Sequence, residues 1–155
     1  SHIIGSVQIA VIGRGVEWAA EAAEVGRLLA ERGCVVVCGG LGEVMEAAAR
    51  GAKEAGGTTV GILPGESARD ANRWIDFAVA TGTGHARNLA VVASCEAAVA
   101  VGGRWGTAAE ISYARVLGRP VVVLGQGPGV EGEGIEHAST PVEAVELVLD
   151  LAGAR

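Results

Sequence analysis

The stretch "CVVVCGGLGEVMEAAARGAKEAGGTTVGILPG", residues 34–65, holds two apolar runs on either side of a longer, more polar segment. The runs "CVVVCGG" (34–40) and "TTVGILPG" (58–65) are rich in β-branched residues and end in glycine, as buried strands do. The intervening "GEVMEAAARGAKEAGG" (42–57) is predicted to be a helix. A strand, a helix and a second strand in this order predict a parallel β-α-β unit.

The same alternation extends along the rest of the chain. The apolar runs are nearly continuous instead of alternating with polar residues, which indicates strands covered by helices on both faces. We therefore expect residues 1–155 to form one α/β domain, a Rossmann-like doubly wound parallel sheet of six to seven strands flanked by helices. The further predicted strands are 7–13, 75–81, 97–103 and 119–125. One further helix is predicted between the first two strands, with Trp18, Ala22, Val25 and Leu29 on its apolar face, and the others are predicted at 86–96, 107–118 and 140–153.

Composition excludes several classes of function. The net charge is −6 and the basic residues are scattered, so a nucleic-acid partner is not expected. No apolar stretch reaches the roughly 18 residues of a membrane span, and the N-terminus lacks the features of a leader, so we expect a cytoplasmic protein. Cys34, Cys38 and Cys95 are odd in number and are expected to be buried, reduced residues. No cluster of His, Cys or Asp has the spacing of a metal site, and no metal is expected.

Two cofactors are disfavoured by particular residues. Lys53 is the chain's one lysine and belongs to a predicted helix, which makes a pyridoxal phosphate Schiff base a poor expectation. The turn after the first strand begins like a dinucleotide fingerprint, but Trp18 takes the place of its third glycine. Gly39 and Gly40 end the second strand where a ribose-binding carboxylate would be expected, so NAD is disfavoured as well.

Three strands end in glycine and lead directly into helices. These turns are "GRGVEW" (13–18), "CGGLGEVM" (38–45) and "VGGRWGT" (101–107). Glycine lets the backbone approach a phosphate closely, and the helix behind it offers free N–H groups and a partial positive charge. Because the carboxyl ends of parallel strands share one edge of the sheet, the turns predict a site for a small phosphorylated ligand there.

Three longer segments carry a family resemblance. Residues 39–65, "HARNLAVVASCEAAVAVGG" (85–103) and "GTAAEISYARVLGRPVVVLG" (106–125) resemble the LOG family, Rossmann-like proteins often labelled possible lysine decarboxylases. The resemblance spans roughly residues 7–125 and points in particular to the small branch that includes molybdenum cofactor carrier proteins. The characterised LOG enzymes are phosphoribohydrolases that split the base from cytokinin riboside 5′-monophosphates.

The family signatures M-H-x-R-K and P-G-G-x-G-T-x-x-E can be placed on this chain. His85 and Arg87 match the first signature, while Asn88 stands in place of its lysine. In the second signature Val101 replaces the proline, and two residues, Arg104 and Trp105, fill a gap that usually holds one. The matching residues of the second signature are Gly102, Gly103, Gly106, Thr107 and Glu110.

The resemblance implies catalytic roles for Arg87 and Glu110. A carboxylate at Glu110 would stabilise the positive charge that develops on the sugar during cleavage, and Arg87, which stays protonated, would act as a fixed cation for a phosphate or the departing base. Glu110 also has a structural alternative, since T-x-x-E at residues 107–110 is a helix capping box. The residues expected to bind the ligand or its phosphate are Gly13, Arg14, Gly39, Gly40, Gly42, His85, Asn88, Gly102, Gly103, Gly106 and Thr107.

Other assignments stay open on the sequence alone. His85 fits a ligand contact or a helix cap, and Trp105 fits stacking on a base or packing at a subunit contact. The leading hypothesis is a nucleotide-like phosphate-ligand protein that hydrolyses nucleoside 5′-monophosphates with no required cofactor. The alternative is a carrier or sensor that holds a phosphorylated ligand such as the molybdenum cofactor without turnover. The resemblance also implies a homodimer or a larger homo-oligomer.

Overall fold

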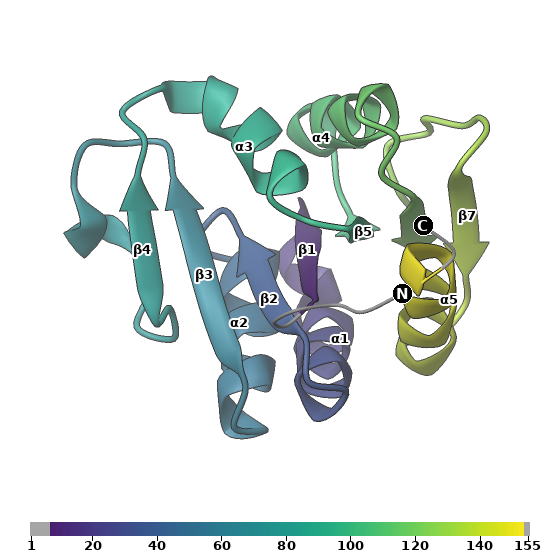
Figure 1. Cartoon of the computed structure of the whole chain (residues 1–155), viewed down its shortest axis with the longest axis horizontal. Helices are drawn as coiled ribbons and strands as arrows, with labels where there is room; N and C mark the ends of the chain where they lie inside the picture. The colour runs from purple at the N-terminus through teal and green to yellow at the C-terminus, as the bar shows by residue number, and fades with distance from the viewer. Residues whose placement is uncertain (1–6, 154–155) are drawn as a thin grey trace.

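A seven-stranded, fully parallel sheet forms the centre of the computed structural model, which describes residues 7–153 (Figure 1). The strand order is β4-β3-β2-β1-β5-β6-β7, and every neighbouring pair runs parallel. The predicted α/β doubly wound fold is therefore confirmed. The strands are β1 (Gln8–Arg14), β2 (Val35–Cys38), β3 (Thr58–Leu63), β4 (Phe77–Ala80), β5 (Ala97–Gly102), β6 (Val121–Leu124) and β7 (Ile135–Ala138).

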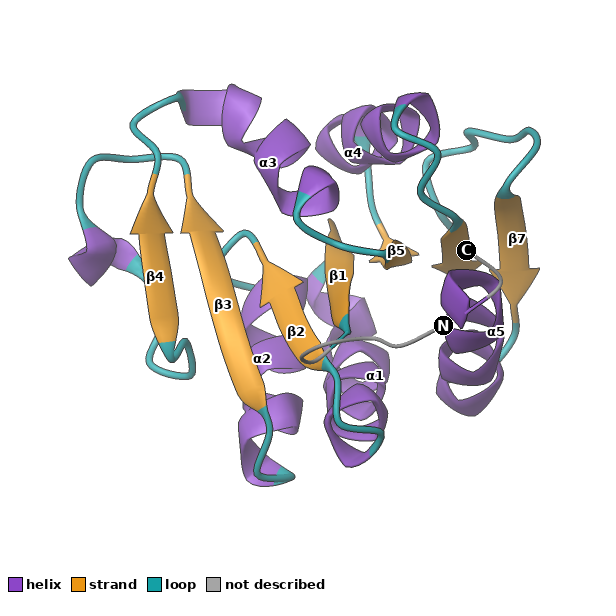
Figure 2. Cartoon of the chain, in the orientation of Figure 1, coloured by secondary structure: helices purple, strands orange, loops and turns teal. Residues whose placement is uncertain are grey.

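Helices cover both faces of the sheet, which gives three layers (Figure 2). One face packs against α1, α2 and α5, and the other against α3 and α4. Buried Val, Leu, Ile and Ala fill the space between the sheet and the helices on both faces, and aromatic residues make up only 3% of the chain. The helices are α1 (Ala19–Glu31), α2 (Val44–Glu54), α3 (Arg87–Ala93), α4 (Trp105–Val116) and α5 (Pro141–Gly153), with short 3₁₀ turns η1 (Val16–Trp18), η2 (Ala68–Asp70) and η3 (Gly84–Ala86).

The last strand, β7, differs from the six that the sequence predicts individually. It has four residues, "IEHA", of which only Ile135 and Ala138 are buried. It lies at the edge of the sheet, where two polar residues face solvent and break the apolar run that identifies the other strands. The upper limit of the predicted range, seven strands, is the observed number.

Two predicted helix starts can be compared. At α5 the side chain of Thr140 accepts a hydrogen bond from the Glu143 amide (3.1 Å), so Thr140 caps the helix at the start of the predicted segment 140–153. At α4 the helix begins at Trp105 with Arg104 as its N-cap residue, two residues before the predicted start. Thr107 therefore lies inside the first turn, and the capping-box alternative for residues 107–110 is wrong.

The chain reverses direction across the sheet between β1 and β5. It proceeds from β1 outward to β4, then crosses through α3 to β5 on the other side of β1. Arg14 pairs in register with Gly102 at the carboxyl ends of these two strands. In open α/β sheets, ligands bind outside such a switch point, and the glycine turns after β1, β2 and β5 meet at this edge.

Candidate functional site

The backbone at the switch point requires glycine at two predicted positions. Gly13 has φ +136°, and a Cβ there would collide with the carbonyl oxygen of Val101 on β5. Gly103 has φ +117°, and a Cβ there would meet the side chain of Thr107. The first close approach lets the end of β1 lie directly against β5, and the second lets the chain turn tightly into α4.

An inner cavity of about 210 Å³ lies above the ends of β1 and β2, between α2, α3 and α4. It brings together ten of the thirteen residues that the sequence singles out. Gly103 lies outside this cavity but lines a neighbouring one, whereas Gly40 and Gly102 line neither and are buried in the turns. The predicted residues lining the inner cavity are Gly13, Arg14, Gly39, Gly42, His85, Arg87, Asn88, Gly106, Thr107 and Glu110, joined by Val11, Ile12, Glu43, Met45 and Arg104.

Arg87 is held by the backbone at the ends of two strands. Its Nη1 donates to the carbonyl oxygens of Gly39 (2.5 Å) and Ile62 (3.0 Å), and its Nε donates to Oδ1 of the buried Asn88 (2.8 Å). Burial lowers the pKa of this guanidinium, while Glu110 opposes the shift. Arg87 therefore uses much of its hydrogen-bonding capacity to hold the ends of β2 and β3 in place.

Glu110 faces the same cavity from the second turn of α4. Burial raises the pKa of its carboxyl group to about 8, although the positive charge of Arg87 acts in the opposite direction. Beneath the cavity, burial also raises the pKa of Cys38 to about 11. Near neutral pH this shift favours the protonated form of Glu110 over the carboxylate.

A larger, outer cavity of about 650 Å³ adjoins the inner one on the side of η1 and the loop after β6. Arg14, Glu43 and Arg104 border both cavities. Its volume lies within the roughly 300–1,000 Å³ typical of small-molecule sites. The outer cavity is lined by Arg14, Gly15, Val16, Glu17, Trp18, Glu43, Gly103, Arg104, Gln126 and Gly127.

Arg104 is an exposed cation at the N-terminus of α4. Within residues 7–153 its side chain makes no ion pair and no hydrogen bond. A positive charge at this end of a helix opposes the helix dipole unless an anion lies nearby. Arg104 and the free N–H groups of the first turn therefore have the charge and the donors that could hold an anion at the junction of the two cavities.

Glu43 lies opposite Arg104, just before α2. It has φ +56° and ψ −123°, and it is the one residue outside glycine with positive φ in the described part of the chain. Its side chain does not cap α2; its Oε1 accepts a hydrogen bond from the Gly15 amide (3.1 Å), and its Oε2 lies 3.8 Å from Nε of Arg14. Such a conformation costs about 1–3 kcal/mol and is commonly found at functional sites.

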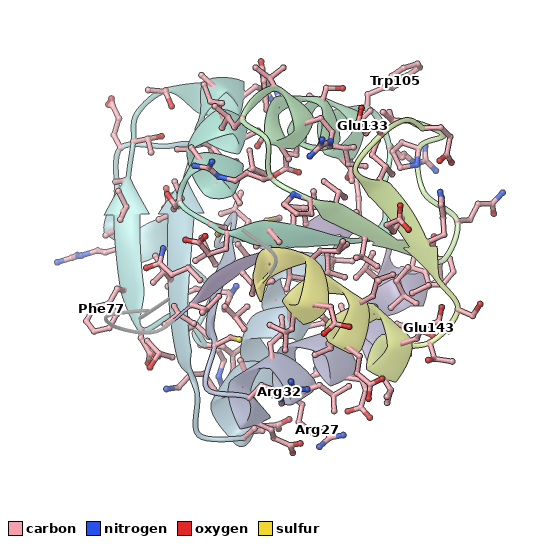
Figure 3. All side chains as sticks on the ribbon, turned by 45° about the vertical axis from the view of Figure 1, so that its right-hand side comes forward. Arg27, Arg32, Phe77, Trp105, Glu133 and Glu143 are labelled. Carbon is pink, nitrogen blue, oxygen red and sulfur yellow. The ribbon has the colours of Figure 1, made fainter. Side chains whose placement is uncertain are left out.

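His85, Trp105 and Lys53 are three further residues that the sequence singles out. His85 is exposed in η3 and lines the inner cavity, and no side chain caps η3 or α3. Trp105 is 88% exposed and projects from the start of α4 (Figure 3). Lys53 bonds Asp76 (2.9 Å) and the Gly57 carbonyl near the start of β3, and it lines neither cavity.

The predicted absences concern cysteines, metals and membranes. All three cysteines are buried and unbridged, as predicted. Residues 7–153 contain no group of three or more His, Cys, Asp or Glu side chains arranged to hold a metal ion. Across this same range, no helix is sufficiently long and apolar to cross a membrane.

Sequence reasoning missed two residues that border both cavities. In the sequence Arg104 is noted only as part of an insertion that lengthens a loop, and Glu43 is not singled out at all. The available signal for Arg104 is a cation directly before a helix, because that placement is unfavourable without an anion. The conformation of Glu43 depends on contacts with β1 that no local pattern encodes.

Comparison with known proteins agrees with this architecture. The model of the SLOG cluster4 family matches residues 6–149. A protein of Archaeoglobus fulgidus is 46% identical over 146 residues, which cover 92% of this chain and 95% of that protein.

Two solved structures resemble the chain over nearly its whole length. The molybdenum cofactor binding protein of Rippkaea orientalis is 30% identical with a TM-score of 0.87, covering 96% of this chain and 98% of that one. The molybdenum cofactor carrier protein of Chlamydomonas reinhardtii is 34% identical with a TM-score of 0.87, covering 96% and 99%. On the strength of the family match, the chain belongs to the SLOG cluster4 family, a group of LOG-like proteins.

Proposed function

We propose that this protein binds a phosphorylated small molecule of the molybdenum cofactor type and holds it without turnover, as a carrier. The observation that carries the proposal is Arg104, a cation without a partner in the described chain, placed at the positive end of α4 where the two cavities meet. A phosphate at this position would satisfy both the guanidinium and the free N–H groups of the helix. The likeness to two molybdenum cofactor proteins supports the choice of ligand class.

The two cavities suit the two parts of such a ligand. The phosphate would lie near Arg104 and the turn at Gly103, where glycine keeps the backbone accessible. The remainder would occupy the outer cavity, whose roughly 650 Å³ leaves room for a fused ring system. In this proposal the ligand is cargo, and no resident cofactor is required.

A phosphoribohydrolase is the second candidate, because Arg87 and Glu110, the pair implied by the LOG resemblance, do line one cavity together. Cleavage of an N-glycosidic bond needs a negative charge beside the developing cation on the sugar. With its pKa raised to about 8, Glu110 supplies little of that charge near neutral pH, and Arg87 is engaged by two carbonyl groups. These features favour holding a ligand over hydrolysing it.

The two candidates can be separated in one set of incubations. The protein is mixed with a panel of nucleoside 5′-monophosphates, and free base and ribose 5-phosphate are measured by liquid chromatography and mass spectrometry. Binding of the intact compounds is measured in parallel by calorimetry. We expect binding without release, and release that Glu110→Gln abolishes would favour the enzyme instead.

We also propose that the protein forms a homodimer or a larger homo-oligomer. Large apolar side chains are exposed along α3 and α4, namely Leu89, Trp105, Tyr113 and Val116. Trp105 and Val116 are eleven residues apart and so lie on one side of α4. Sedimentation of the wild type and of Val116→Glu tests this, since a charge at a subunit contact should shift the protein towards the monomer.

A further inference from the structure

The carboxylate of Glu43 occupies the hydrogen-bonding groups that an anionic ligand would use. It accepts the Gly15 amide at 3.1 Å and lies 3.8 Å from Nε of Arg14, a side chain that is 67% exposed. A backbone N–H in a glycine turn beside an arginine is a common phosphate-binding pair. In the free protein this pair is already neutralised from within the chain.

The backbone of Glu43 indicates that this placement is built into the fold. A side chain at the N-terminus of a helix ordinarily reaches the free amides of its own first turn. Glu43 instead adopts φ +56° and extends its carboxylate across to the turn after β1. An L-residue holds this conformation only where its surroundings enforce it.

We propose that Glu43 is an internal competitor for the anionic ligand: its carboxylate holds the position made by the Gly15 amide and Arg14, and a bound phosphate displaces it. This inference rests on the proposed function, which places a phosphate at Arg104, and adds a second anion position on Arg14 and Gly15 that borders the same junction of the two cavities. A ligand gains from this position only if it binds more strongly than the resident carboxylate. The requirement favours phosphate over singly charged carboxylates.

Glu17 provides a matched control. Its carboxylate lies beside Gly15 and lines the outer cavity, so its removal changes the charge of the cavity by the same amount. Within residues 7–153, however, Glu17 forms no ion pair and accepts no hydrogen bond from Gly15. A general effect of charge would appear in both variants, whereas displacement of a competitor would appear only at Glu43.

The test is calorimetric titration of inorganic phosphate into the full chain at fixed ionic strength. We expect Glu43→Ala to bind phosphate about three- to tenfold more tightly than the wild type, with Glu17→Ala changing the affinity less than twofold. Glu43→Gly also lacks the carboxylate and tolerates positive φ, so it should show the same gain if the alanine variant folds poorly. Structural damage weakens binding and cannot produce this gain.

Three results would overturn the inference. The first is equal affinity of the wild type and Glu43→Ala for phosphate. In that case the proposed anion site at Arg104 would still stand if Arg104→Ala bound phosphate at least tenfold more weakly than the wild type. Weaker binding by both Glu43 variants would make Glu43 a residue that positions Arg14 for the ligand. If no variant bound phosphate, this inference and the proposed function would fail together.

Discussion

The inner and outer cavities share a wall but differ in what their charged groups do. In the inner cavity Arg87 bonds two backbone carbonyl groups, and the raised pKa of Glu110 favours its protonated form near neutral pH. Arg14 and Arg104, which border the outer cavity as well as the inner one, are exposed, and Arg104 has no partner in the described chain. Of the residues that match the LOG signatures, Arg87 and Glu110 thus contribute mainly to the architecture of the site, and the proposed anion position lies beside them, at Arg104 and the first turn of α4.

The largest expected difference between the cavities is in stability. Arg87→Ala should lower the free energy of unfolding by about 3 kcal/mol, because the carbonyl groups of Gly39 and Ile62 lose a charged donor. Arg104→Ala should change it by less than about 0.5 kcal/mol, as expected of an exposed side chain. Urea denaturation of both variants measures this, and equal losses would show that the distinction is wrong.

The pH dependence of stability gives the second test. The folded-state pKa of Glu110 is raised to about 8 from an ordinary value of 4.5, so the folded protein binds the proton more tightly than the unfolded chain. The protonated carboxyl group therefore contributes to the free energy of unfolding fully below pH 4.5, and this contribution is lost as the pH rises to about 8. Glu110→Gln should remove this pH-dependent loss of stability, because glutamine stays neutral.

We therefore expect Glu110→Gln and the wild type to be about equally stable at pH 4.5. At pH 8.5 the variant should be more stable, by an amount on the order of 2 kcal/mol. The comparison uses urea denaturation of both proteins at the two pH values. A difference in the free energy of unfolding that does not change with pH would mean that the pKa of the Glu110 carboxyl group is not raised.

The third test concerns ligand affinity. Arg104→Ala should bind inorganic phosphate about tenfold more weakly, since one charge-assisted contact contributes about 1.5 kcal/mol. Arg73→Ala is the matched control, because this arginine is also exposed and instead stacks over the ring of Trp74 at 4.6 Å. Equal weakening by both variants would reduce the effect to overall charge.

The smallest expected effect is at Trp105. Because the indole is 88% exposed, Trp105→Ala should alter the free energy of unfolding of the isolated subunit by no more than about 0.5 kcal/mol. Thermal unfolding at low protein concentration measures this. A larger loss that grows with protein concentration would place Trp105 in a subunit contact and would support one of the two roles left open for it.

The sequence predicts most of the fold because most of its strands are buried on both faces and read as apolar runs. The edge strand β4 also reads as an apolar run, although Phe77 and Val79 are exposed in it. The exceptions are β7, where Glu136 and His137 interrupt the run, and the start of α4, where Gly106 hides a helical turn that begins at Trp105. The inner cavity could also be predicted, since glycine turns at parallel strand ends share one edge of the sheet. The hydrogen bonds of Arg87 and the strained Glu43 could not, because both arise from contacts between distant segments.

We expect the protein to carry a ligand of the molybdenum cofactor type without consuming it. The most direct test of this expectation is the molybdenum and pterin content of the protein purified from a host that makes the cofactor, with Arg104→Ala prepared in parallel. We expect molybdenum and intact pterin to be bound to the wild type in comparable amounts, and clearly less of both to be bound to the variant. Wild-type protein that contains neither molybdenum nor pterin, yet releases free base from a nucleoside monophosphate, would contradict it.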